Sequence, residues 1–136
     1  MTEDELYQQG MEARREVLGD AHVDRALANA TEFTAPWQDF ITKHAWGAVW
    51  TRDGLDRRTR SAITLTALTA LGRENEIAMH VRAALGNGLT KEEIGEVLIH
   101  TAVYAGVPAA NAAFAIAQGV FDEATGSSSG SSQTAT

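Results

Sequence analysis

The sequence predicts an all-α protein, a single-domain bundle of about six to seven helices. Apolar residues recur at three- and four-residue intervals through most of the chain, and helix-start signals precede several of these segments. We find no alternating strand pattern of useful length. With 136 residues, of which 44% are hydrophobic, the chain can bury one core. We therefore expect one domain over residues 1–124 and a disordered polar tail over residues 125–136.

The first helices are predicted from capping signals. Thr2 with Glu5 matches a capping box, which begins a helix over residues 3–18. A shorter helix is expected over residues 20–30, with His22 at the surface. The high charge density of residues 3–18 predicts that this first helix is a surface or packing arm.

A third helix is predicted to begin at Thr34 and Pro36, because proline favours the first turn. This segment carries all three tryptophans of the chain. Such a concentration is typical of a buried core or a subunit interface, and a ligand pocket is the alternative. The candidate pocket residues here are His44, Trp46 and Trp50.

The next helix is expected over residues 57–71, capped by Asp56. It opens with Arg57, Arg58 and Arg60 and then becomes almost wholly apolar and small, which predicts a central place in the bundle. Positive charge at a helix N-terminus opposes the helix dipole, so these arginines indicate a nearby anion. That anion could be a substrate carboxylate or a glutamate of a neighbouring subunit. In the simpler alternative, the arginines form a first turn that is exposed to solvent.

Three further helices complete the chain. One is predicted over residues 73–85, and a capping box at Thr90 and Glu93 begins the next, which ends before Gly106. The last is predicted over residues 109–123, rich in alanine and therefore able to pack closely.

The candidate chemistry lies on the helix over residues 73–85. Glu76 and His80 stand four residues apart and share one face, with Arg73 one turn further back. A carboxylate beside an imidazole can act as a proton-transfer pair. The spacing alone is common, but the surrounding apolar residues make a charged pair harder to explain as a solvated surface feature.

Glu96, His100 and Tyr104 repeat this spacing on the following helix and are second-rank candidates. The two acid and imidazole pairs together offer a conceivable metal site, but they lack the HExxH pattern, so we expect no metal.

Composition excludes several classes of function. The chain has no cysteine, which rules out disulfides, thiolate chemistry and iron–sulfur ligation. A net charge of −7 argues against nucleic-acid binding. The acidic start has no apolar signal segment, and no apolar run has the length of a membrane span. We expect a cytoplasmic protein without a membrane partner.

Residues 46–110 carry motifs that resemble a known family. WGxxWxRxGLDRRTRS is followed by ExxxHVRAAL, then by TxEEIxE, and finally by VYAGVPAA. This series resembles the carboxymuconolactone decarboxylase family, within the alkylhydroperoxidase-like superfamily. Superfamily members with peroxidase activity carry a CxxCxxxH motif whose histidine matches His80. Here Glu76 and Arg73, or its immediate neighbourhood, occupy the two cysteine positions.

The resemblance implies a cofactor-free carboxy-lyase of protocatechuate catabolism that converts 4-carboxymuconolactone to 3-oxoadipate enol-lactone and carbon dioxide. It also implies a homo-oligomer, commonly a hexamer. His80, oriented by Glu76, would deliver a proton or a hydrogen bond, and one or more of the arginines would hold the spectator acetate group. The arginine candidates are Arg57, Arg58, Arg60 and Arg73. Trp46 or Trp50 would face the leaving carboxylate.

Three alternatives stay open from the sequence. The same residues would serve a cofactor-free lactone isomerase or hydrolase, which product analysis separates from a decarboxylase. A non-catalytic helical oligomer that binds a small acid or a partner helix is the second alternative. A peroxide-reducing protein that borrows cysteines from a partner is the third.

Overall fold

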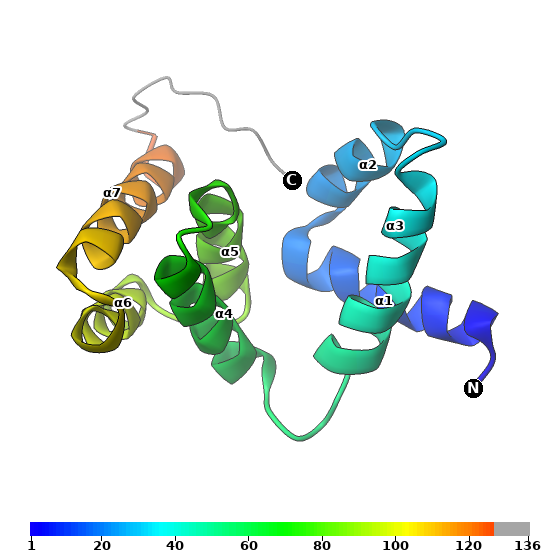
Figure 1. The fold of residues 1–136 in the computed structure, drawn as a ribbon, viewed down its shortest axis with the longest axis horizontal. Helices are drawn as coiled ribbons and strands as arrows, with labels where there is room; N and C mark the ends of the chain where they lie inside the picture. The colour runs from blue at the N-terminus through cyan, green and yellow to red at the C-terminus, as the bar shows by residue number, and fades with distance from the viewer. Residues whose placement is uncertain (127–136) are drawn as a thin grey trace. The chain divides into compact units, whose positions relative to one another are not determined.

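The computed structural model describes residues 1–126 and contains only helices and turns over that range (Figure 1). The all-α prediction is confirmed. The chain forms two compact units, Met1–Arg57 and a second that begins at Arg58, and each is described by itself. The single-domain expectation stays a prediction. Most of the predicted tail, residues 127–136, lies outside the described residues.

The first unit contains α1 (Glu3–Leu18), α2 (Asp20–Ala28), α3 (Ala35–Ile41) and the π-helix η1 (Thr42–Trp50). The predicted capping box begins α1. The Glu5 N–H donates to the Thr2 hydroxyl at 3.1 Å, and the Thr2 N–H donates to the Glu5 carboxylate at 2.9 Å. These hydrogen bonds lower the pKa of Glu5 below its ordinary value. The helix predicted over residues 20–30 ends at Ala28, two residues early.

Helices α1 and η1 touch backbone to backbone at two glycines. A Cβ atom added at Gly10 would lie 1.8 Å from the Thr42 carbonyl oxygen, and one added at Gly47 would lie 2.6 Å from the Leu6 carbonyl oxygen. Only glycine fits at both positions, so these two residues fix how closely the helices approach.

The segment with the tryptophans changes helix type at Thr42. The Thr42 hydroxyl donates to the Gln38 carbonyl at 2.7 Å, and the Thr51 hydroxyl donates to the Gly47 carbonyl at 2.5 Å. Thr64 and Thr101 make the same hydroxyl-to-carbonyl hydrogen bond inside regular α-helices of this chain, so these bonds alone do not account for the wider helix. The sequence pattern predicts an α-helix throughout and does not distinguish the two types.

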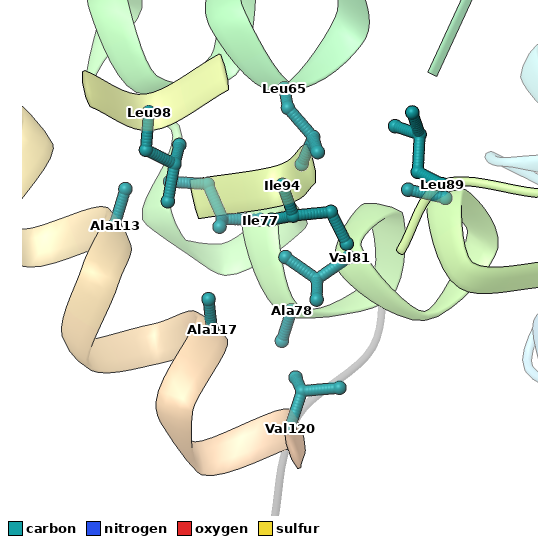
Figure 2. Close-up of a cluster of buried hydrophobic side chains, with 11 residues drawn as sticks. Leu65, Ile77, Ala78, Val81, Leu89, Ile94, Leu98, Ala113, Ala117 and Val120 are labelled. Atoms are coloured by element: carbon teal, nitrogen blue, oxygen red, sulfur yellow. The ribbon is translucent and has the colours of Figure 1, made fainter. Parts of the chain in front are cut away.

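The second unit contains most of α4 (Arg57–Leu71), with α5 (Glu74–Gly86), α6 (Lys91–Ala105) and α7 (Val107–Ala124). Its core takes residues from all four helices, as Figure 2 shows. Leu65, Ile77, Ile94 and Leu98 are fully buried and pack with small residues of α7 such as Ala113. Alanines on α7 let that helix approach closely, as the composition predicts.

Helix α4 is less central than its apolar sequence predicts. Its buried residues are Ser61, Leu65 and Thr69, which form a single stripe. Ile63 is 53% exposed and Leu71 is 67% exposed. The expectation that other helices surround α4 on most sides is therefore wrong for a single chain. The described residues of the second unit cover only the face of α4 that carries the buried stripe.

Candidate active site

Helix α5 carries Glu76 and His80 one turn apart, and both side chains are partly buried. They neighbour the buried residues Ile77, Ala78 and Val81 of the same helix. Arg73 is exposed and immediately precedes the helix, where its carbonyl accepts a hydrogen bond from the Glu76 N–H at 3.1 Å. A carboxylate and an imidazole on one partly buried helix face are groups that can transfer a proton. The catalytic roles stay predictions.

Two of the predicted substrate arginines form ion pairs with glutamates of this chain. Arg57 Nη1 lies 2.7 Å from a carboxylate oxygen of Glu16. Arg58 pairs with Glu93, and its Nε donates to the Gly88 carbonyl at 3.3 Å. Glutamates of the same chain therefore supply an anion to these two arginines, and their contact with a substrate stays a prediction. Arg60 is partly buried one turn beyond Arg57.

The candidates of η1 differ in exposure. Trp46 is only 7% exposed and stacks against half-buried Trp50, with ring centroids 5.1 Å apart. His44 is exposed, and its ring lies 4.8 Å from that of Phe40. Trp46 thus packs inside the first unit, as the core interpretation predicts, whereas Trp37 is 58% exposed and does not belong to a core within this chain.

His100 and Tyr104 are exposed on α6, with ring centroids 5.4 Å apart. His100 also lines a groove of about 530 Å³ between α4 and α6. The other lining residues are small or apolar except for Glu96. They are Ala62, Ile63, Thr66, Ala67, Glu96 and Val97. The sequence did not predict this groove, although the run of small residues in α4 is the signal that could have indicated it.

Two residues differ from the sequence interpretation. His22 is 9% exposed and belongs to the buried face of α2 with Val23, so its expected surface position is wrong. Arg14 is 3% exposed, and no role was predicted for it. Its position on the same face as the buried Gly10, Ala13 and Val17 is the periodic signal that could have identified it.

Over residues 1–126, we find no group of three or more histidine and acidic side chains placed to hold a metal ion. In the same range, none of the helices combines the length and the apolar character that a membrane crossing requires.

These features describe an all-α protein that presents a carboxylate and an imidazole on one helix and contains no thiol. The model of the carboxymuconolactone decarboxylase family matches residues 35–119, and the chain belongs to this family.

Individual relatives agree with this assignment. A 4-carboxymuconolactone decarboxylase of Acinetobacter baylyi is 50% identical over 90% of this chain and 92% of its own length. A nitrosuccinic acid decarboxylase of Metarhizium robertsii is 44% identical over 83% of this chain and 79% of its own length. A 4-carboxymuconolactone decarboxylase of Pseudomonas putida is 51% identical over 35% of this chain, which covers 98% of that sequence.

Proposed function

We propose that this protein is a carboxy-lyase that converts 4-carboxymuconolactone to 3-oxoadipate enol-lactone and carbon dioxide without a cofactor. The observation that carries the proposal is the 50% identity to the Acinetobacter baylyi decarboxylase across nearly the full length of both chains. The Metarhizium robertsii relative supports the same reaction class, since it is also a decarboxylase.

The chemistry of the proposed substrate explains why no cofactor is expected. When the bond between the ring carbon and its carboxylate breaks, the electron pair moves through the ring double bond to the lactone carbonyl. Carbon dioxide leaves, and a ring carbon then takes up a proton. Because the substrate accepts the electrons itself, the protein supplies orientation, stabilisation of the developing oxyanion and a proton.

Within the second unit, we assign His80 as the group that donates the proton, and Glu76 as the residue that holds the imidazole in orientation. Their shared position on α5, partly buried beside the core, supports this assignment. Arg73 is our first choice for the spectator acetate group, because it precedes the same helix and no ion pair of its side chain is found among residues 58–126. Arg57 and Arg58 would first have to leave Glu16 and Glu93. Arg60, His44, Trp46, Trp50, His100 and Tyr104 remain predicted contacts.

We also propose that the protein works as a homo-oligomer, with the hexamer of the family as the expected form. Large apolar side chains of the second unit support this proposal. Val103 is 74% exposed and Tyr104 is 81% exposed, and Ile63, Ile99 and Val107 are exposed as well. Soluble monomers seldom expose so many large apolar side chains on neighbouring helices. The cytoplasmic location stays a prediction.

The test is an assay with 4-carboxymuconolactone generated in situ. We expect loss of its ultraviolet absorbance together with one molecule of carbon dioxide for each lactone consumed. Loss of absorbance without carbon dioxide would instead indicate an isomerase or a hydrolase. No turnover of the lactone would overturn the proposal.

Nitrosuccinic acid is a second candidate substrate, favoured by the 44% identity to the Metarhizium robertsii enzyme. Its nitro group can accept the electron pair released when the carboxylate on the same carbon leaves as carbon dioxide, the role that the lactone carbonyl has, through the ring double bond, in the first candidate. Comparing kcat/KM for the two acids on the same preparation decides between them.

A further inference from the structure

Helices α4 and α6 of the second unit leave an open groove of about 530 Å³ between them. Small and apolar side chains of α4 line one side of the groove, and Glu96, Val97 and His100 of α6 line the other. Neither Glu76 nor His80 is among the described residues that line it. The groove is therefore separate from the candidate active site.

The hydroxyl groups at the groove are already used in hydrogen bonds. Thr66 of α4 lines the groove, and its hydroxyl lies 3.0 Å from the hydroxyl of Thr101 of α6. The Thr101 hydroxyl donates to the Val97 carbonyl at 2.7 Å, so the hydrogen shared by the two threonines comes from Thr66. Because neither hydroxyl has a second hydrogen to donate, this part of the groove favours an apolar occupant.

The charged groups at the groove exclude an anionic occupant. Glu96 carries a negative charge, and neither arginine nor lysine is found among the described lining residues. Within residues 58–126, Glu96 and His100 form no ion pair, and the His100 ring contacts that of Tyr104. A molecule that fills the groove therefore needs an apolar surface, with a donor for Glu96 and an acceptor for the imidazole.

Large apolar side chains extend beside the groove. Ile63 lines it from α4 and is exposed, and Ile99 and Val103 are exposed on α6 next to His100. An apolar surface of this extent is typical of a contact with another protein chain. Residues 127–136 of the same chain do not suit it, because their sequence contains no large apolar residue.

We propose that the occupant is a second copy of this chain, related by a two-fold axis, with the two α6 helices antiparallel and Glu96 of each copy facing His100 of the other. The proposal rests on the homo-oligomer proposed above and names one of its contacts. A two-fold contact places the same surface on both copies, so that surface must complement itself. An acid and an imidazole four residues apart on one helix face meet this requirement, because both pairs form at once and each carboxylate accepts from an imidazole N–H.

The same register also fits the apolar residues. When residue 96 faces residue 100 across antiparallel helices, residue 99 faces residue 97. Ile99 of one copy would therefore enter the groove of the other beside Val97, which lines it. Burial of Ile99 away from water would supply the driving force, and the polar pairs would set the register.

Sedimentation velocity of the full chain over a range of concentrations tests the proposal. His100→Glu places two carboxylates opposite each other, and Glu96→Lys removes the acceptor of the imidazole. Each variant should raise the concentration at which half of the assembly dissociates by about tenfold or more. The double variant, with Lys at 96 and Glu at 100, restores the pair in reverse and should return within about threefold of wild type.

The size of the dissociated species is a second expected result. Loss of a two-fold contact halves a closed assembly, so a hexamer should give trimers and a dimer should give monomers. Glu32→Lys is the control, because it makes the same charge change at an exposed turn of the first unit and should sediment as wild type does. Circular dichroism confirms that each variant keeps its helix content, as expected for substitutions at exposed positions.

Three results would overturn the proposal. A wild type that is monomeric at all concentrations would leave the groove to a different protein. Unchanged assembly of both single variants would place the contact on another surface. A double variant that dissociates as readily as the single variants would exclude the pairing of Glu96 with His100. Turnover of the lactone is measured separately on the wild type, so the decarboxylase proposal can fail or hold independently of these results.

Discussion

The proposed chemistry depends on single side chains, and replacing His80 tests it most directly. Glutamine keeps a hydrogen-bonding group of similar size but cannot transfer a proton, so His80→Gln should lower kcat for decarboxylation about 100-fold while the helix content is kept. Steady-state kinetics and circular dichroism measure the two effects. Arg82→Gln is the control on the same helix, because Arg82 is held 3.0 Å from Glu123 and has no assigned role in catalysis. Full turnover by His80→Gln would show that another group supplies the proton.

Replacing Glu76 should lower kcat less than replacing His80 does, because Glu76 acts only through the imidazole. Glu76→Gln keeps a side chain of the same size but removes the carboxylate that we assign to orienting His80, so catalysis should weaken while substrate binding is kept. A tenfold loss of kcat is the expected size, with KM little changed. A variant whose KM rose while kcat stayed unchanged would contradict the positioning role of Glu76.

The arginines at the start of α4 show which contacts of a single residue could be predicted from the sequence and which could not. The sequence correctly indicated an anion near the start of α4, because three guanidinium groups at a helix N-terminus are unfavourable alone. It did not indicate Glu16 and Glu93, since these lie 41 and 35 residues from their partners. Sequence spacing predicts neighbours within a helix but not between helices.

Among the elements, the α1 and η1 contact depends on glycine. Gly10→Ala places a methyl group 1.8 Å from a backbone oxygen and should destabilise the protein by about 3 kcal/mol or more. Gly119→Ala in α7 is the matched control, because its Cβ meets no atom within 4 Å. There the higher helix propensity of alanine should stabilise by about 0.5–1 kcal/mol. Urea unfolding of both variants measures the difference, and similar stabilities would contradict the close contact.

The start of α6 offers a second test of an element. The Glu93 N–H donates to the Thr90 hydroxyl at 3.0 Å, and the Glu93 carboxylate accepts from the Thr90 N–H at 2.9 Å. Thr90→Ala removes one half of this capping box and should cost about 1 kcal/mol. Thr90→Ser restores the hydroxyl and should regain most of the loss in a urea titration. Equal stability of the Ala and Ser variants would exclude a contribution from the cap.

Element boundaries were predicted closely where local signals exist. The capping boxes at Thr2 and Thr90 and the break at Gly106, which has a positive φ, act within a few residues and can be predicted from sequence. The π-helix was not predicted, because the sequence pattern of this segment does not distinguish a π-helix from an α-helix.

For the whole molecule, assembly is the property to test. Val103→Glu puts a charge on the exposed apolar surface of α6 and should shift the protein from the oligomer toward smaller species, because a desolvated carboxylate has no partner there. Sedimentation velocity measures the change. Asn111→Glu, at an exposed polar position of α7, should sediment as the wild type does. An unchanged sedimentation coefficient for Val103→Glu would place the subunit contacts on another surface.

By itself the sequence determined the all-α class, the start of most helices and the placing of Glu76 and His80 one turn apart on one helix, because helical periodicity and capping act over a few residues. Arg73, expected on the same face, instead precedes the helix in a non-helical conformation. Its motifs also identified the family. Only the tertiary structure decided that Arg14 is buried, that Arg57 and Arg58 meet glutamates, and that α4 leaves one face exposed. These properties depend on contacts between residues far apart in the chain, which local patterns do not encode.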